Sequence, residues 1–128
     1  MSDNIQISRE TAEKELNEFL DFHDVDQDDE ANKQFKDRLI RAMVDNRLEF
    51  QKDEDGDLYA VQTTKNGSTI EYKGSMAQAK IEMGKYKNNF EAQFAFLGVM
   101  TKEGADAIKK LGSRDAKIAD CISVFLAG

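Results

Sequence analysis

Carboxylates gather in residues 51–62, QKDEDGDLYAVQ, and carboxylate oxygens are ligands that Ca²⁺ prefers. An EF-hand loop needs oxygen ligands at its positions 1, 3 and 5, glycine at position 6 and a bidentate glutamate at position 12. With Gly56 at position 6, Asp53 and Asp55 take positions 3 and 5, but positions 1 and 12 both fall on glutamine. The carboxylate that would close the loop is missing, so this segment does not predict a Ca²⁺ site.

The same segment has the pattern of a tight turn between two strands. Apolar residues stand on both sides of it (Leu48 and Phe50 before, Leu58, Tyr59 and Val61 after). An Asp-Gly pair between two such runs is typical of a β-hairpin, because glycine accepts a positive φ. A hairpin turn is therefore the preferred interpretation.

A second acidic run, DVDQDDE at residues 24–30, fails the same test. Counting from Asp24 places Asp29 where the loop needs glycine, and Phe35 where it needs glutamate. We therefore expect no metal ion and no cofactor at either acidic run.

The residues that usually perform catalysis are few. His23 is the single histidine, and without a nucleophile and an orienting group it is interpreted as a solvated surface residue. Cys121 is next to Asp120 and to apolar residues, which favours a buried structural thiol over a reactive one. The sequence has neither a GxxxxGK[ST] loop nor a GxGxxG motif. We therefore expect that the protein is not an enzyme.

Charge is unevenly distributed along the 128 residues, whose net charge is −7. Residues 1–30 hold eleven acidic side chains against Arg9 and Lys14. An acidic surface repels phosphate, so nucleic acid is not an expected partner. Four lysines form a mild basic cluster, for which a solvated helix face is preferred to a binding site for an acidic partner (Lys73, Lys80, Lys85, Lys87).

Length and composition point to one globular domain. A chain of 128 residues with 40% hydrophobic residues is long enough to bury a core. It has no apolar run that could span a bilayer and no secretory signal, so a membrane is not expected. A single cysteine excludes an intrachain disulfide and suggests a reducing compartment.

Hydrophobic spacing changes twice along the chain. Residues 1–46 predict an acidic pair of antiparallel helices, the first capped by Ser8, the second starting at Asp28 or Asp29 and stopping at Asn46. Residues 47–73 have a period of two, interrupted by Asp-Gly and Asn-Gly, which predicts a three-stranded antiparallel meander.

Residues 75–127 return to helical spacing. Ser75 and Gln78 have capping-box spacing, and Thr101 and Ser113 are expected to cap later helices, with Gly112 ending the helix between them. The expected core stripes are listed by helix (Met76, Ala79, Met83; Phe90, Phe94, Leu97; Ala105, Ile108, Leu111; Ile118, Ile122, Phe125). The fold class is therefore α+β: two N-terminal helices, a three-stranded antiparallel meander and three to four short C-terminal helices in a single domain, 1–128.

The order of these elements resembles the small tail assembly chaperones of long-tailed bacteriophages. The resemblance covers roughly residues 43–127 and includes the spacing L-x-x-x-T-x-x-x-x-x-x-I-x-x-L-x-x-x-D and the apolar end V-F-L. The residues that match the family's pattern are Leu97, Ile108, Leu111, Asp115, Val124, Phe125 and Leu126. The family's Arg-Pro helix entry is replaced here by residues 72–75, YKGS, and the acidic helix pair is an addition.

This resemblance implies a non-enzymatic role in the host cytoplasm. Such chaperones bind the tape measure protein and help recruit tail tube subunits. The alternative is a phage structural protein that stays in the virion, such as a head–tail joining or decoration subunit. A small enzyme or Ca²⁺ sensor is a third reading, and a homo-oligomer is left open.

The partner-binding surface is expected in residues 90–126, where apolar residues occupy more than one helical stripe. We assign Ile118, Ile122 and Phe125 mainly to the core. Phe96, Val99 and Leu126 lie off the main stripes and are the predicted contact residues.

Overall fold

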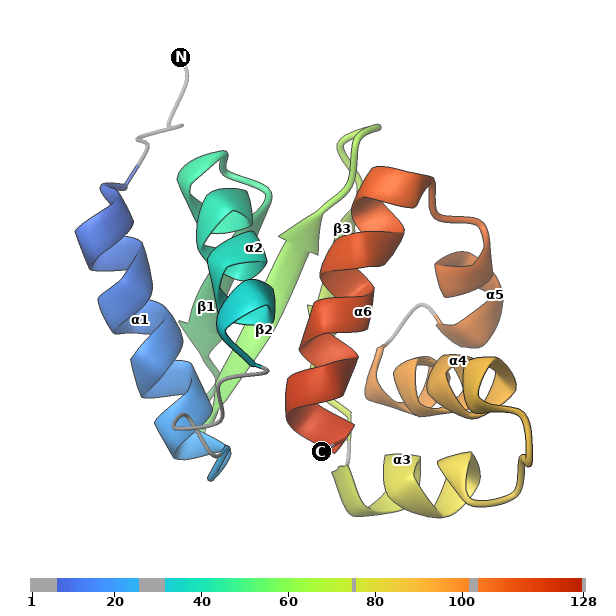
Figure 1. The fold of residues 1–128 in the computed structure, drawn as a ribbon. Helices are drawn as coiled ribbons and strands as arrows, with labels where there is room; N and C mark the ends of the chain where they lie inside the picture. The colour runs from blue at the N-terminus through green and yellow to red at the C-terminus, as the bar shows by residue number, and fades with distance from the viewer. Residues whose placement is uncertain (1–6, 26–31, 75, 102–103, 128) are drawn as a thin grey trace.

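A computed structural model describes residues 7–25, 32–74, 76–101 and 104–127 (Figure 1). Helices α1 and α2 precede a three-stranded sheet, and helices α3 to α6 follow it. The α+β class and this order of elements confirm the prediction.

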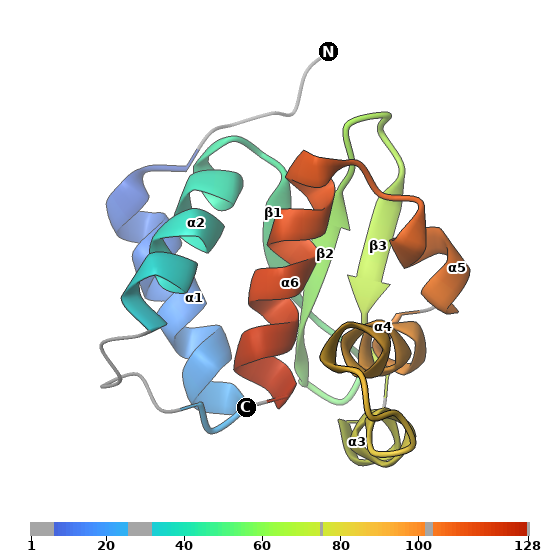
Figure 2. The same ribbon diagram turned by 45° about the vertical axis from the view of Figure 1, so that its right-hand side comes forward.

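The two N-terminal helices lie side by side and run in opposite directions (Figures 1 and 2). Helix α1 spans Arg9–Phe22, and the Ser8 hydroxyl oxygen caps it by accepting the Thr11 N–H at 3.1 Å. Helix α2 spans Lys33–Val44, and Asn46 follows it with a φ of 60°, as expected for a left-handed stop. The predicted starts at Asp28 and Asp29 lie outside the described residues.

The meander is confirmed in strand order and in the position of both turns. Strands β1 (Leu48–Lys52), β2 (Leu58–Thr63) and β3 (Thr69–Tyr72) form an antiparallel sheet in the order β1-β2-β3. The two predicted turn glycines, Gly56 and Gly67, have φ values of 83° and 89°.

One face of the sheet carries the core, and the opposite face carries mainly polar side chains around Val61. Helices α1, α2 and α6 cover the first face (Figures 1 and 2), which presents Leu48, Phe50, Ala60, Ile70 and Tyr72. On the second face the Tyr59 hydroxyl donates to Gln51 at 3.0 Å, and the Lys73 ammonium lies 4.7 Å from the centre of the Tyr59 ring. Among the described elements no helix covers this second face.

The C-terminal half begins with a helical hairpin beside the end of β3. It consists of α3 (Met76–Met83) and α4 (Asn89–Met100), and the Asn88 side chain caps α4 by accepting the Phe90 N–H at 2.8 Å. Two further helices complete the chain, α5 (Gly104–Lys109) and the 15-residue α6 (Ser113–Ala127). The predicted Ser75 cap lies outside the described residues.

Two predicted helix boundaries in this half are wrong. Thr101 is the C-cap residue that follows α4 rather than the cap of α5. Its backbone pairs with Tyr72 next to the sheet, and its hydroxyl donates to the Leu97 carbonyl at 2.8 Å. The second wrong boundary is the start of α6. The Gly112 carbonyl accepts the Ala116 N–H at 2.9 Å, which is the first hydrogen bond of the helix, so Gly112 occupies the N-cap position. Ser113, the predicted cap, is the first residue of α6.

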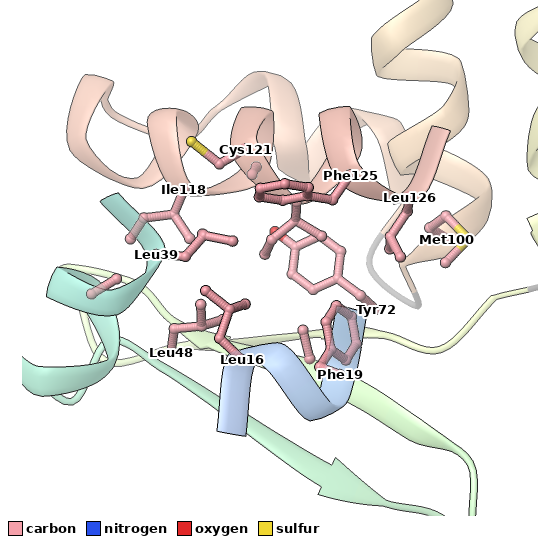
Figure 3. Close-up of a cluster of buried hydrophobic side chains, with 14 of the residues drawn as sticks. Leu16, Phe19, Leu39, Leu48, Tyr72, Met100, Ile118, Cys121, Phe125 and Leu126 are labelled. Atoms are coloured by element: carbon pink, nitrogen blue, oxygen red, sulfur yellow. The ribbon is translucent and has the colours of Figure 1, made fainter. Parts of the chain in front are cut away.

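Helix α6 lies across the sheet and contributes one long side of the core (Figure 3). Ile118, Ile122 and Phe125 are buried, which confirms their assignment to the core. The ring of Phe125 also makes an edge contact with Phe35 of α2, with centroids 6.3 Å apart. The core therefore joins the N-terminal helices, the sheet and α6 into one unit.

Candidate interaction surface

Within the acidic segment 51–62, residues 53–57 form a hairpin turn, as the Asp-Gly pair predicts. It joins two strands rather than the two helices of an EF-hand. One oxygen of Asp53 accepts the N–H groups of Asp55 and Asp57 at 2.9 and 3.0 Å, which is a local turn-stabilising arrangement. Asp53, Asp55 and Asp57 each have a carboxylate oxygen within 4.8 Å of the others. Asp53 therefore has a structural task in the turn.

His23 closes the C-terminal end of α1 and ties that helix to the sheet. Its Nε2–H donates to the Leu58 carbonyl at 2.9 Å, and its ring makes edge contacts with Phe19 and Phe22. The ring is half-buried and packed against two aromatic rings, so His23 is not the solvated surface residue that we expected.

Cys121 is fully buried on α6, as expected for a structural thiol. Burial raises the pKa of the Cys121 thiol, and the nearby Arg38 guanidinium opposes part of that effect. A thiol with a raised pKa carries little thiolate near neutral pH and is a poor nucleophile.

Asp115, which matches the aspartate of the resemblance pattern, is buried at the start of α6. One oxygen of its carboxylate accepts the Lys65 N–H at 3.0 Å, so the side chain fastens the β2–β3 turn to α6. Beside it is a cavity of about 680 Å³ between that turn and the α5–α6 link. The position of Asp115 supports a structural role for this residue.

Two of the three predicted contact residues are buried in the core, so the prediction that they are free to touch a partner is wrong. Phe96 has an exposed fraction of 0% and Leu126 of 4%, and Val99 is half-buried against the same core. Leu126 points from the last turn of α6 toward Met100 (Figure 3). Neither Phe96 nor Leu126 can reach a partner while the domain stays folded.

Phe96 and Val99 are covered because α4 is the central helix of its half. It contacts α3, α5, α6 and β3, so its apolar residues are buried on several sides rather than on one stripe. Burial also changes along the helix: Leu97 is 1% exposed, Phe94 is partly buried and Phe90 is 74% exposed. Phe90 shares the stripe of Leu97 but belongs to the first turn of α4, which extends beyond the core.

Three of the five large exposed apolar side chains in the described residues belong to the α3–α4 hairpin, and one of them, Phe90, was predicted as a core residue. Ile81 on α3, Tyr86 in the link and Phe90 on α4 are 68%, 45% and 74% exposed. We call these three residues the hairpin tip. Helix α3 packs mainly on α4 and lies at the periphery (Figures 1 and 2), which is why the tip has so little cover. Exposed lysines surround the tip in the sequence (Lys80, Lys85, Lys87).

Exposed apolar patches often mark binding surfaces, and these three side chains belong to one helical hairpin. The sequence signal that could have found the tip is weak: Phe90 and Ile81 flank Gly84 and an Asn-Asn pair, which interrupts the helical spacing. Within the described residues no helix is long and apolar enough to cross a membrane. No family model, curated protein or solved structure matches this chain.

Proposed function

We propose that this protein is a tail assembly chaperone of a long-tailed phage, acting in the host cytoplasm. In this role it binds apolar helices of the tape measure protein and helps recruit tail tube subunits. The single observation that carries the proposal is the hairpin tip, where Ile81, Tyr86 and Phe90 stay exposed although the rest of the domain has a closed core. The order of elements that resembles the chaperone family is the second support.

The tip has properties that suit a holding role. Burying an exposed side chain of the size of Phe90 or Ile81 contributes about 1.5–3 kcal/mol, so a few such contacts give reversible binding. Lysines beside the tip keep the free surface hydrated and place charge at the rim of a contact, where it affects the rate of association. This role needs no chemical step, in agreement with the expectation that the protein is not an enzyme.

The direct test is co-purification of the tape measure protein with Phe90→Asp and Ile81→Asp variants. Each change places a charge on the proposed contact and should abolish co-purification, because the charge loses its water on binding. Val124→Asp is the matched control, because Val124 is 39% exposed on α6 and lies outside the tip. All three variants should keep the thermal midpoint of the parent, since all three positions are exposed.

Two outcomes would overturn the proposal. Normal co-purification of folded Phe90→Asp and Ile81→Asp would exclude the tip as the contact. Abundant peptides of this chain in purified virions, found by mass spectrometry, would support the virion structural protein instead.

A further inference from the structure

A groove lined by five cationic side chains lies between α2 and α6, in a protein whose net charge is −7. It has a volume of about 270 Å³, and its cationic lining residues are Arg38, Arg41, Arg47, Arg114 and Lys117. The C-terminal part of α2 and the start of α6 meet at the opposite end of α6 from the α3–α4 hairpin (Figures 1 and 2). We call this groove the arginine groove.

Part of the positive charge in the arginine groove has no counterion. Arg41 pairs with Asp37 at 2.8 Å and Arg47 pairs with Asp45 at 3.0 Å. Among the described residues Arg114 and Lys117 make no ion pair. The Nε of Arg47 is buried and has no hydrogen-bond partner in the described part of the chain. The groove therefore has unused donors as well as unpaired charge.

The arrangement of the groove favours carboxylates or other compact oxyanions. Arg38 and Arg41 are one turn apart on α2, and Arg114 and Lys117 are one turn apart on α6. Guanidinium groups bind carboxylates in a bidentate manner. The first turn of α6 adds the positive end of a 15-residue helix next to Ser113. Two rows of cations on facing helices match a pair of anions spaced by one turn.

We propose that the arginine groove binds an acidic segment of a partner protein through at least two of its carboxylates. Nucleic acid fits less well, because a long polyanion would also meet the acidic helix α1, which packs against α2. This site is separate from the hairpin tip and does not depend on the proposed chaperone role.

The test uses a labelled helical peptide of about 12 residues with glutamates three and four residues apart, so that they share one face. Fluorescence anisotropy should show binding to the full chain that weakens as ionic strength rises, because salt screens exposed charges. The double variant Arg114→Gln and Lys117→Gln should raise the Kd on the order of tenfold. The double variant Lys52→Gln and Lys109→Gln makes the same change in net charge at two exposed lysines outside the groove and the hairpin tip, and it should leave the Kd unchanged.

Several results would overturn the proposal. Equal binding of a peptide with glutamine in place of every glutamate would show that charge is not recognised. An unchanged Kd in the Arg114 and Lys117 double variant would place the contact elsewhere. Full displacement of the peptide by millimolar inorganic phosphate would identify a phosphate site, and tighter binding of a DNA oligonucleotide would identify a nucleic-acid site.

Discussion

The side-chain amide of Gln62 donates a hydrogen bond of 2.9 Å to the backbone carbonyl of Asp115, which is 53 residues away in the sequence. Gln62 is fully buried in β2, and its own carbonyl oxygen accepts the Tyr72 hydroxyl at 2.5 Å. One side chain therefore connects the central strand, the edge strand β3 and the first turn of α6. A buried polar group with both partners in place specifies how these three elements fit together.

Replacing Gln62 by Leu should lower the free energy of unfolding by about 3 kcal/mol. The change nearly keeps the volume but removes the two buried hydrogen bonds that Gln62 makes, to the Tyr72 hydroxyl and to the Asp115 carbonyl, and losing one partner of a buried hydrogen bond costs about 1–3 kcal/mol. Urea denaturation measures the difference. Gln34→Leu on the exposed side of α2 is the control and should change stability by no more than about 0.5 kcal/mol. Equal effects of the two changes would contradict the role of Gln62.

Gly74→Ala should destabilise the contact between the α4 end and β3. A Cβ at this position would lie 2.1 Å from the Val99 carbonyl oxygen and 2.7 Å from the Met100 Cα, so the backbone has to move. Movement would also strain the 2.8 Å hydrogen bond from the Gly74 N–H to the Met100 carbonyl. Forcing in a methyl group costs about 1–3 kcal/mol or more.

The matched control for Gly74 is Gly84→Ala at the end of α3. Its nearest atoms would be 3.5 and 3.6 Å from the added Cβ, which are ordinary contact distances. Thermal unfolding of both variants should show a lower midpoint for Gly74→Ala alone. A normal midpoint for Gly74→Ala would mean that this approach of the two backbones tolerates a side chain.

Leu126→Asp should unfold the domain rather than weaken a surface contact, because Leu126 is buried in the core. An unpaired carboxylate in an apolar site is strongly destabilising. Phe125→Ala should cost about 3–5 kcal/mol through the cavity it leaves. Val124→Asp on the exposed side of the same helix is the control and should retain the native far-UV circular dichroism. A folded Leu126→Asp protein would contradict the burial of this residue.

The free energy of unfolding should decrease at acid pH, partly because Asp37, which links α1 to α2 through its ion pair with Arg9, becomes protonated. The Arg9 guanidinium, which donates to the Asp37 carboxylate, holds the pKa of Asp37 below its ordinary value, and Arg41 acts in the same direction. A folded pKa below the unfolded value gives stability above the unfolded pKa of about 3.9, and this stability is lost as pH falls through the folded pKa.

Asp37→Asn should therefore be less stable than the parent at pH 7, and the two proteins should converge as the pH falls below the ordinary carboxyl range. Denaturant midpoints measured across the acid range provide the comparison. A constant difference between the two proteins from neutral to acid pH would show that the charge of Asp37 does not contribute.

The stability of the acidic turn should depend on Asp53 and Gly56, and not on the other acidic residues of the turn. Asp53→Ala removes the acceptor of two N–H groups and should cost about 1 kcal/mol, whereas Asp53→Asn keeps an oxygen there and should be neutral within about 0.5 kcal/mol. Gly56→Val should cost more than Asp53→Asn, because a β-branched residue resists a φ of 83°. Urea midpoints give the order, and a large loss in Asp57→Asn would indicate a site that the turn does not explain.

Local signals in the sequence were sufficient for the N-terminal pair and the meander. Ser8 supplies an oxygen for the first turn of α1, Asn46 adopts the left-handed conformation that ends α2, and Gly56 and Gly67 accept the positive φ of tight turns. Each of these effects acts over a few residues, so each can be read from neighbours in the sequence. The α+β class followed from the change between the two hydrophobic periods.

Tertiary packing alone decided which apolar residues of α4 are buried and where cations meet. The α4 sequence has apolar residues on several sides, so its period cannot distinguish Phe96, which is enclosed by neighbouring helices, from Phe90, which extends beyond them. Arg38 and Arg114 are far apart in the sequence and share a groove because α2 and α6 pack together. Burial and charge clustering depend on contacts between distant elements, and a local pattern contains no information about those contacts.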